Sequence, residues 1–553
     1  MKKALCIFFA VLMTVLSGCS IAQKENTKST ESYDKSAFGY KGKSISTDRT
    51  EKGHISLACS INDSFCPYTA RTLINRQLSP LIYDSLVKVD DGFTPENSLA
   101  SEVKVSGTTV KVTLREAYFT DGSAVTAGDV VYCAQKAKES DTRWGDCMKS
   151  ISSIGASGST VVFTLKNHDP YAANLLDFPV YKMNTENKKS VDNISIPPIG
   201  SGMYKLNSDK SKLTVNEYYR GTKPQIKKIY LINTPDEDAL THNLETGNIT
   251  YYYSDLSDCS LSMVRGNYKK VNTSNLVYLG VNMASGPMYY SEMRQAVSSA
   301  LDRKKIVSSA YFENAVASSS VFNPQWQEVK TMVASPEKTA NSNVYLAQLE
   351  KIGYNKKNKK GYFVNPSGET LEISLISYKG NEWRHGAAKL IKEQLKSAGI
   401  KVNLKSLSWN EYISSLKTGS FDMYISEVKL SQNMDISAIV SKDSAISYGV
   451  TYGKKKKIKK KTASQSEKSI ADDEVKKSKD KEVEDVAGKT ATAVANYKSG
   501  DAEISDILVD FNAELPIIPL LYRTGLVSYS VDISPIKPAE NNPYSGIENA
   551  KIK

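Results

Sequence analysis

Residues 112–132 place a strand, a tight turn and a capped helix in direct succession, and no other stretch constrains the fold as strongly. Apolar residues alternate with polar ones over 110–114, which is typical of a strand with one buried face. The Asp-Gly pair at 121–122 predicts a tight turn, because glycine accepts a positive φ and aspartate hydrogen-bonds the turn backbone. Thr126 stands three residues before Asp129, which predicts a capping box at the start of a helix.

A second segment, residues 371–404, predicts a β-α-β unit. Its strands alternate and its helix carries an apolar stripe formed by Ala387, Ile391, Leu395 and Ala398, with Gly399 as the stop signal. Strand, helix and strand at this length imply a parallel pair with a right-handed crossover. Ligands of open α/β sheets bind beyond the carboxyl ends of the strands. Trp383 lies at that edge and is a candidate binding residue; packing against the helix is the equal alternative.

The N-terminal residues are typical of an export signal. Two lysines precede an apolar run, residues 4–16, that is shorter than a membrane-spanning helix requires. Small residues then lead directly into Cys19, as in a bacterial lipobox, so we expect residues 1–18 to be removed and Cys19 to be diacylated. An ordinary cleaved signal peptide is the alternative. Two acyl chains suffice for stable membrane attachment, and the polar residues 19–47 predict a flexible tether.

The charge and the cysteines exclude some classes of partner and site. The formal net charge is +12, but an exported lipoprotein rarely meets nucleic acid, so we expect an anionic envelope surface as its neighbour and no nucleic acid. Five cysteines remain after the export segment: Cys59, Cys66, Cys133, Cys147 and Cys259. Buried free thiols and one or two disulfides are equal alternatives. Their spacing does not form a paired CxxC site, so we predict no metal site.

The strand-turn-helix segment resembles the signature of the family 5 extracellular solute-binding proteins. Leu-Arg at 114–115, Phe-Thr-Asp-Gly at 119–122 and Val-Thr-Ala-Gly-Asp-Val at 125–130 follow its pattern. A second family pattern, R-x-A-x-x-x-A-x-D-R, is matched at 294–303, and further matches extend from residue 55 to residue 529. The resemblance implies an α/β, two-lobe periplasmic-binding-protein-like fold with hinge strands and an extra subdomain in the first lobe.

The resemblance also implies a domain order. The Lys-rich, low-complexity composition of residues 454–490 cannot bury enough apolar surface for a core. We expect this segment to be a solvated insertion, with a functional basic patch as the alternative. The expected parts are a first lobe at 48–275 with an inserted subdomain at about 85–198, a second lobe at 276–510 that carries the insertion, and a return to the first lobe at 511–553. Hinge strands are expected at 277–282 and 515–520.

Family membership would make the chain a non-catalytic protein that captures a solute between two lobes and delivers it to the permease of an ABC importer. A peptide is the favoured ligand; an oligosaccharide, a metal chelate or haem is the alternative. An exported hydrolase is a further alternative, but the chain has no GxSxG or HExxH motif and its four histidines are scattered. We therefore predict no enzyme activity and no cofactor.

Candidate ligand-binding residues follow from the same reasoning and are Tyr68, Asn282, Trp383, Trp409 and Asp435. In peptide-binding relatives, an acidic residue in the loop after the Phe-Asp-Met strand pairs with the peptide amino terminus. Asp435 is the carboxylate of that loop here, but its position is shifted. Whether this chain recognises the ammonium group of a peptide is therefore left open. We expect a monomer, lipid-anchored on the outer face of the cytoplasmic membrane, which is the periplasmic side in a Gram-negative cell.

Overall fold

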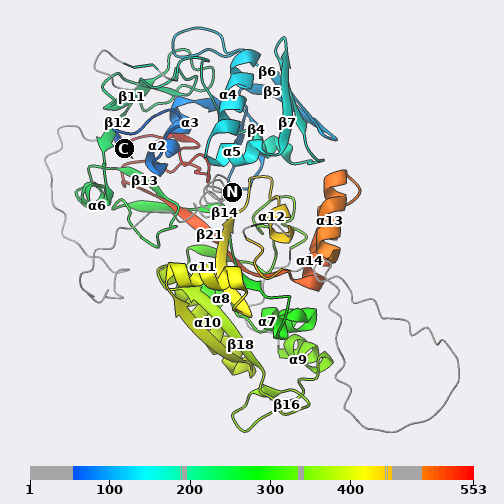
Figure 1. Ribbon diagram of the computed structural model, residues 1–553. Coiled ribbons are helices and arrows are strands. Elements are labelled where there is room, and N and C mark those ends of the chain that lie inside the picture. The colour runs from blue at the N-terminus through cyan, green and yellow to red at the C-terminus, as the bar shows by residue number, and fades with distance from the viewer. Residues whose placement is uncertain are drawn as a thin grey trace, which may run out of the picture.

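The computed structural model describes residues 54–186, 188–189, 196–333, 342–441, 444, 446–450 and 488–553. The predictions for residues 1–47 and for most of the insertion lie outside this range. Two long antiparallel strands, β14 (Asn267–Val281) and β21 (Ile517–Tyr529), run through the middle of the molecule and connect its upper and lower parts (Figure 1). Their pairing register shifts between Asn272 and Leu276, just before the predicted hinge segment.

The sheet around these strands has seven strands, in the order β13-β21-β14-β20-β18-β19, with β15 also paired to β21. The added strands are β13 (Tyr251–Ser254), β15 (Ala315–Ala317), β18 (Glu372–Tyr378), β19 (Lys401–Leu407) and β20 (Met423–Lys429). The predicted β-α-β unit is confirmed: β18 and β19 are parallel and α10 (Glu382–Ala398) connects them. All four predicted stripe residues of α10 are buried, and Gly399 ends the helix at a φ of 92°.

The first lobe contains two further sheets of four strands. One has the order β1-β12-β11-β10 and the other β5-β6-β8-β7. Their strands are β1 (Ile55–Cys59), β12 (Lys228–Asn233), β11 (Lys212–Val215) and β10 (Tyr204–Leu206), then β5 (Ala100–Ser106), β6 (Thr109–Leu114), β8 (Thr160–Leu165) and β7 (Ile151–Ser157). The second sheet lies within the expected subdomain and packs against α4 (Ala127–Glu139), which in turn contacts α5 (Arg143–Met148).

The strand-turn-helix segment has the predicted structure. Thr126 Oγ1 accepts a hydrogen bond from Asp129 N at 3.3 Å, and Asp129 Oδ2 accepts one from Thr126 N at 3.0 Å. This reciprocal pair satisfies backbone donors that the first helical turn leaves open. Gly122 has a φ of 82°, as the turn requires.

The remaining helices and short strand pairs complete the two lobes. The helices are α2 (Leu73–Gln77), α3 (Ser79–Ile82), α6 (Glu237–Glu245), α7 (Ser291–Ser299), α8 (Arg303–Ala310), α9 (Ser342–Lys351), α11 (Trp409–Thr418), α12 (Ser437–Val440), α13 (Gly488–Ser499) and α14 (Ile504–Glu514). The short pairs are β2 (Asp84–Ser85) with β9 (Pro179–Val180), β3 (Val87–Val89) with β4 (Pro95–Asn97), and β16 (Lys356–Lys357) with β17 (Phe363–Val364).

Helix α13 was not expected from the sequence, and it begins inside the segment that we predicted to be a solvated insertion. Thr490 is fully buried, because Glu514 at the end of α14 accepts hydrogen bonds from its backbone N–H and its hydroxyl. Residues 488–490 therefore belong to the folded body. The rest of that segment lies outside the described residues.

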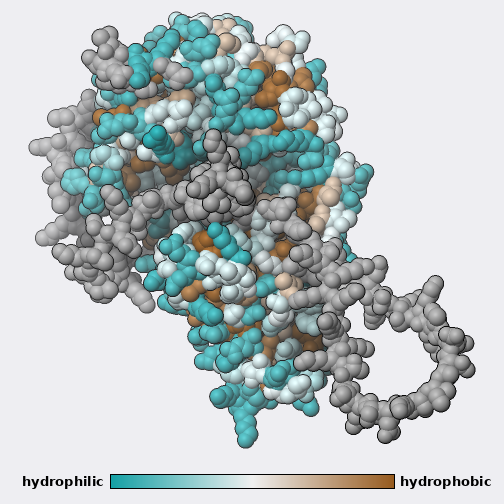
Figure 2. Space-filling view, viewed as in Figure 1, coloured by the Kyte–Doolittle hydropathy of each residue, from teal (hydrophilic) through white to brown (hydrophobic). Residues whose placement is uncertain are grey.

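Each lobe has its own hydrophobic core, packed against its sheets. One cluster fills the first lobe around its two sheets. The second lobe has one cluster on each face of the seven-stranded sheet: α7, α8 and α10 cover one face, and α11 to α14 cover the other. Polar side chains dominate the face drawn in Figure 2, where apolar ones appear in separate small groups. Within the described part of the chain, no helix is both long and apolar enough to cross a bilayer.

Candidate interlobe binding site

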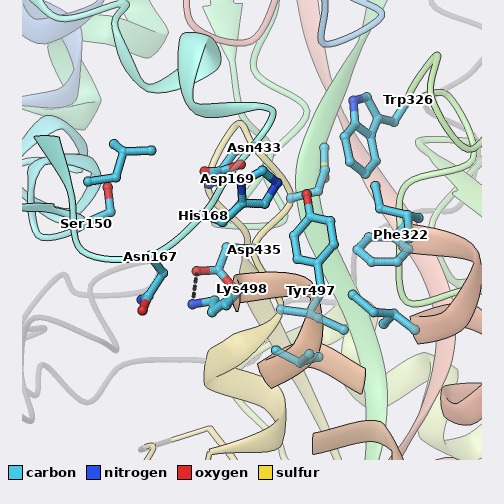
Figure 3. A pocket seen from close by; sticks show the side chains of 16 residues that line it. Ser150, Asn167, His168, Asp169, Phe322, Trp326, Asn433, Asp435, Tyr497 and Lys498 are labelled. Atoms are coloured by element: carbon cyan, nitrogen blue, oxygen red, sulfur yellow. Dashed lines mark hydrogen bonds and ion pairs between the residues drawn. The ribbon is translucent and has the colours of Figure 1, made fainter. Parts of the chain in front are cut away.

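A small cavity of about 50 Å³ lies between the first-lobe subdomain and the second lobe (Figure 3). The first lobe contributes the turn before β7 and the loop after β8, and the second lobe contributes the loop before α12 and the helices α13 and α14. One part of the wall is apolar and the other carries charged and amide groups. The lining residues are Ser150, Leu165, Asn167, His168, Asp169, Phe322, Trp326, Asn433, Met434, Asp435, Ile436, Val494, Tyr497, Lys498, Ile504 and Ile507.

Asp435 lies in this cavity, and its carboxylate already has partners from the chain. Its Oδ2 is 3.0 Å from the Lys498 Nζ on α13, and its Oδ1 accepts hydrogen bonds from the backbone N–H and the hydroxyl of Ser437 (Figure 3). Lys498 thus takes the place that a ligand ammonium would need. A ligand amine would have to displace Lys498 from Asp435.

A second carboxylate, Asp169, lies close to Asp435 on the polar side of the cavity (Figure 3). Asp169 Oδ2 accepts a hydrogen bond from Asn433 Nδ2 at 2.6 Å, which connects the first-lobe loop to the loop before α12. Burial raises the pKa of Asp169, and the hydrogen bond from Asn433 offsets part of that rise. Next to it, His168 N donates to Lys498 O at 2.8 Å. Both contacts join the two lobes directly.

Glu540, in the C-terminal return to the first lobe, makes a third connection. Its carboxylate is 2.8 Å from Lys429 Nζ at the end of β20, 2.9 Å from Gln432 Nε2 and 3.1 Å from Ser274 N. The Glu540 side chain is 4% exposed. Burial opposes its ionisation, but Lys429 and the donors hold its pKa below the usual value of 4.5. The contacts of Asp169, His168 and Glu540 form what we call the interlobe seam, and the Asp435–Lys498 pair lies beside them in the cavity.

A buried ionic cluster lies on the face of the seven-stranded sheet that α10 covers. Arg523 on β21 donates through Nε and Nη2 to Glu427 Oε1 on β20, at 3.0 and 2.8 Å. Glu427 Oε2 also lies 3.5 Å from Arg384 Nη1, at the start of α10. Burial opposes ionisation of Arg523, yet the charges of Glu427 and Asp255 outweigh it and keep its pKa above the usual value. Arg523 therefore stays charged at neutral pH.

The five predicted ligand-binding residues do not share one site. Tyr68 is buried in the first-lobe core, where its hydroxyl donates to Pro179 O and its ring packs edge-on against Trp144. Asn282, after β14, donates its amide to Gly419 O and Phe421 O, each at 3.1 Å. Both side chains thus have structural partners within their own lobes.

The two predicted tryptophans occupy different surroundings. Trp383 is 5% exposed and packs edge-on against Tyr311 and Phe312, beside the ionic cluster. Trp409 is 37% exposed and lies between the rings of Tyr378 and Tyr412. The structure thus places Trp383 beside the ionic cluster and Asp435 in the cavity. Tyr68 and Asn282 lie in neither place.

Sequence reasoning missed Arg523 and Glu427. Both interrupt apolar strands, in LLYRTGLV and MYISEVK, and a charge inside a strand that is otherwise buried was the signal available. The five cysteines of the folded part are free thiols, and four of them are buried. Among the described residues, no three His, Cys, Asp or Glu side chains are grouped as ligands for a metal ion.

Two α/β lobes joined by paired strands and facing each other across a polar seam define a solute-binding protein of the periplasmic type. The family model described as "Bacterial extracellular solute-binding proteins, family 5 Middle" matches residues 94–440. The chain belongs to this family, and it is a binding protein rather than an enzyme.

Known relatives bind different solutes. The chain is 26% identical over 452 residues to the oligopeptide-binding protein AppA of Bacillus subtilis, covering 76% of this chain and 79% of that protein. Its fold is similar to the unliganded open form of the murein tripeptide-binding protein MppA, with a TM-score of 0.68, 18% identity, and 91% and 98% of the two chains covered. NikA of Brucella suis in complex with Fe(III)-EDTA gives a TM-score of 0.62 at 17% identity, with 90% and 100% covered.

Proposed function

We propose that this protein captures a peptide between its lobes and presents it to the permease subunits of an ABC importer. The observation that carries the proposal is the interlobe seam: side chains from both lobes converge on a cavity and on a charged cluster, and two strands connect the lobes. The similarity to the oligopeptide-binding AppA favours a peptide over other solutes. An extended peptide offers backbone groups that strand edges recognise largely independently of side chains.

The lobes are proposed to close around the ligand as two bodies. The register shift between Asn272 and Leu276, opposite Arg523, supports a hinge at this point of the strand pair. A ligand that contacts both lobes favours the closed state by its higher affinity for that state. In this proposal, the protein acts as a monomer that is tethered to the outer face of the membrane through a diacylated Cys19.

A thermal-shift screen of a mixed peptide digest, oligosaccharides and metal chelates tests this proposal. A solute at 100 times its dissociation constant stabilises the fold by roughly 2.7 kcal/mol. Small-angle scattering of the same samples should show compaction with the stabilising solute. Stabilisation by sugars or chelates but not by peptides would refute the choice of ligand, and hydrolysis of a stabilising peptide would refute a pure binding role.

A chelate is the second candidate ligand, because the similarly folded NikA was solved with Fe(III)-EDTA. The same screen separates the two candidates. Mass spectrometry of whatever co-purifies with the protein provides an independent answer.

A further inference from the structure

The region beside α10 contains two buried donors that find no partner among the described residues. They are the Nη1 of Arg523 and the hydroxyl of Tyr311, whose residues are 3% and 0% exposed. A buried polar group without a partner is costly, so native proteins rarely keep one without a reason. Two of them in one cluster indicate that something else completes their hydrogen bonds.

These two donors belong to the same small region. Tyr311 is four residues before Ala315, which pairs with Arg523 across β15 and β21. The Tyr311 ring lies 5.6 Å from the ring of Trp383, which directly precedes Arg384 of the cluster. Burial raises the pKa of Tyr311, and the charges of Glu427, Arg384 and Arg523 all act on its hydroxyl. The hydroxyl therefore stays protonated and remains a donor.

The carboxylates of the cavity, the seam and the ionic cluster, in contrast, already have donors from the protein. Asp435 has Lys498, Asp169 has Asn433, Glu427 has Arg523 and Arg384, and Glu540 has Lys429. An incoming ammonium would have to break one of these pairs. An incoming carboxylate oxygen would find the unused Nη1 of Arg523, since Nε and Nη2 of this guanidinium already donate to Glu427. The hydroxyl of Tyr311 is a second unused donor in the same region.

The site is placed where a captured solute can reach it. Glu427 and Arg384 are 14% and 13% exposed, so the cluster borders on solvent. Phe312, whose ring contacts that of Trp383, is 45% exposed and provides an apolar rim. The segment between β13 and β14 also borders this region, because Cys259 and Met263 pack against the same core.

We propose that Arg523 and Tyr311 bind an anionic group of the solute, so that the protein selects solutes with a free carboxylate over their neutral counterparts. The proposal rests on solute capture between the lobes and adds to it the charge of the group recognised. In a peptide, this group is the terminal carboxylate or an acidic side chain.

The main variant is Tyr311→Phe, which removes one hydroxyl and leaves the ring packing against Trp383 intact. Since that hydroxyl has no partner in the protein, its removal should leave the unliganded protein at least as stable as before. Affinity for a carboxylate-bearing solute should fall about ten- to a hundredfold, because a hydrogen bond to a charged group is lost. A purely structural role would not weaken binding while stability is kept.

Thr524→Val is the matched control. Thr524 Oγ1 is also buried and unpartnered, but neighbouring residues of a strand point to opposite faces, so it lies away from Arg523. This variant should keep both stability and affinity. Arg523→Lys, which retains the charge but loses the planar fork, should weaken binding of the same solutes.

The probe is a casein digest mixed with the same digest after conversion of its carboxyl groups to methyl esters, and captured peptides are identified by mass spectrometry. We expect the free acids to be captured preferentially by the wild type and by Thr524→Val, and this preference to disappear in Tyr311→Phe. Equal capture of acids and esters by the wild type, or an unchanged preference in Tyr311→Phe, would overturn the inference.

A further arm separates this inference from the proposed function. If neither form of the digest is captured, the peptide proposal fails, and citrate and sugar phosphates are then tested by thermal shift. Stabilisation by these anions that is lost in Tyr311→Phe supports the anion site without a peptide. No stabilisation by any of them overturns the anion site as well.

Discussion

Replacing Glu540 with glutamine tests how strongly the seam contributes to stability. The substitution preserves the shape of the side chain and removes its charge. Its Lys429 partner is 43% exposed and regains water, so the ion pair itself contributes modestly. The buried bonds from Gln432 and Ser274, however, go to a charged acceptor, and one carboxylate oxygen becomes an amide that cannot accept. Together these losses predict a decrease of about 2 kcal/mol in the free energy of unfolding.

The expected pH dependence follows from the lowered pKa of Glu540. A carboxylate with a folded pKa below its unfolded value contributes stability above the unfolded value and loses it as the pH falls through the folded value. The difference between wild type and Glu540→Gln should thus be full near neutral pH and should shrink below the usual value of 4.5.

Urea unfolding followed by tryptophan fluorescence, at neutral and at acidic pH, measures this difference. Glu102→Gln is the control, because Glu102 pairs with Lys104 on the surface, where both side chains are more than half exposed; no measurable loss is expected there. Equal midpoints for wild type and Glu540→Gln at neutral pH, or a difference that does not change with pH, would refute the reasoning.

Three further predictions concern other parts of the chain. Cys19→Ala should leave the protein unprocessed or release it from the membrane fraction; processing and anchoring as before would contradict lipidation. Replacing residues 454–487 with a short Gly/Ser linker should leave the melting temperature nearly unchanged, since loop-closure entropy depends weakly on length, whereas a large drop would mean that the segment is structural. Thr126→Val should cost roughly 1 kcal/mol by removing the cap of α4; urea unfolding that matches the wild type would count against the capping box.

Much of the fold could be predicted because local signals and tertiary packing agree. The capping box at Thr126 and the stripe of α10 lie where the sequence places them, since both depend on contacts within a few residues. Helix α13 was missed because its stability depends on Glu514, which is distant in sequence and supplies acceptors for Lys489 and Thr490. Its own composition resembles the polar segment before it.

The candidate site was harder to predict, because its residues come from separate strands. Arg523 and Glu427 are almost a hundred residues apart, and neither belongs to a motif. Asp435 was chosen from its loop, but no sequence pattern indicates that Lys498 pairs with it. Spacing reveals neighbours on one helix or strand; it cannot reveal which distant charges meet between two lobes.

The distribution of thiols provides a native reporter of solute binding. Cys59, Cys66, Cys133 and Cys147 are buried in the first lobe, and burial raises the pKa of each thiol, to about 12 for Cys59 and Cys147, so alkylating reagents react with them slowly.

Cys259 is the exception, because it is only partly buried and packs against the second-lobe core that contains Trp383. Residues after 259 contain no cysteine. Iodoacetamide should therefore modify Cys259 faster than the four buried thiols, and a solute that binds beside Trp383 should slow that rate. The wild-type chain can thus report on its own solute binding, with no dye or engineered label.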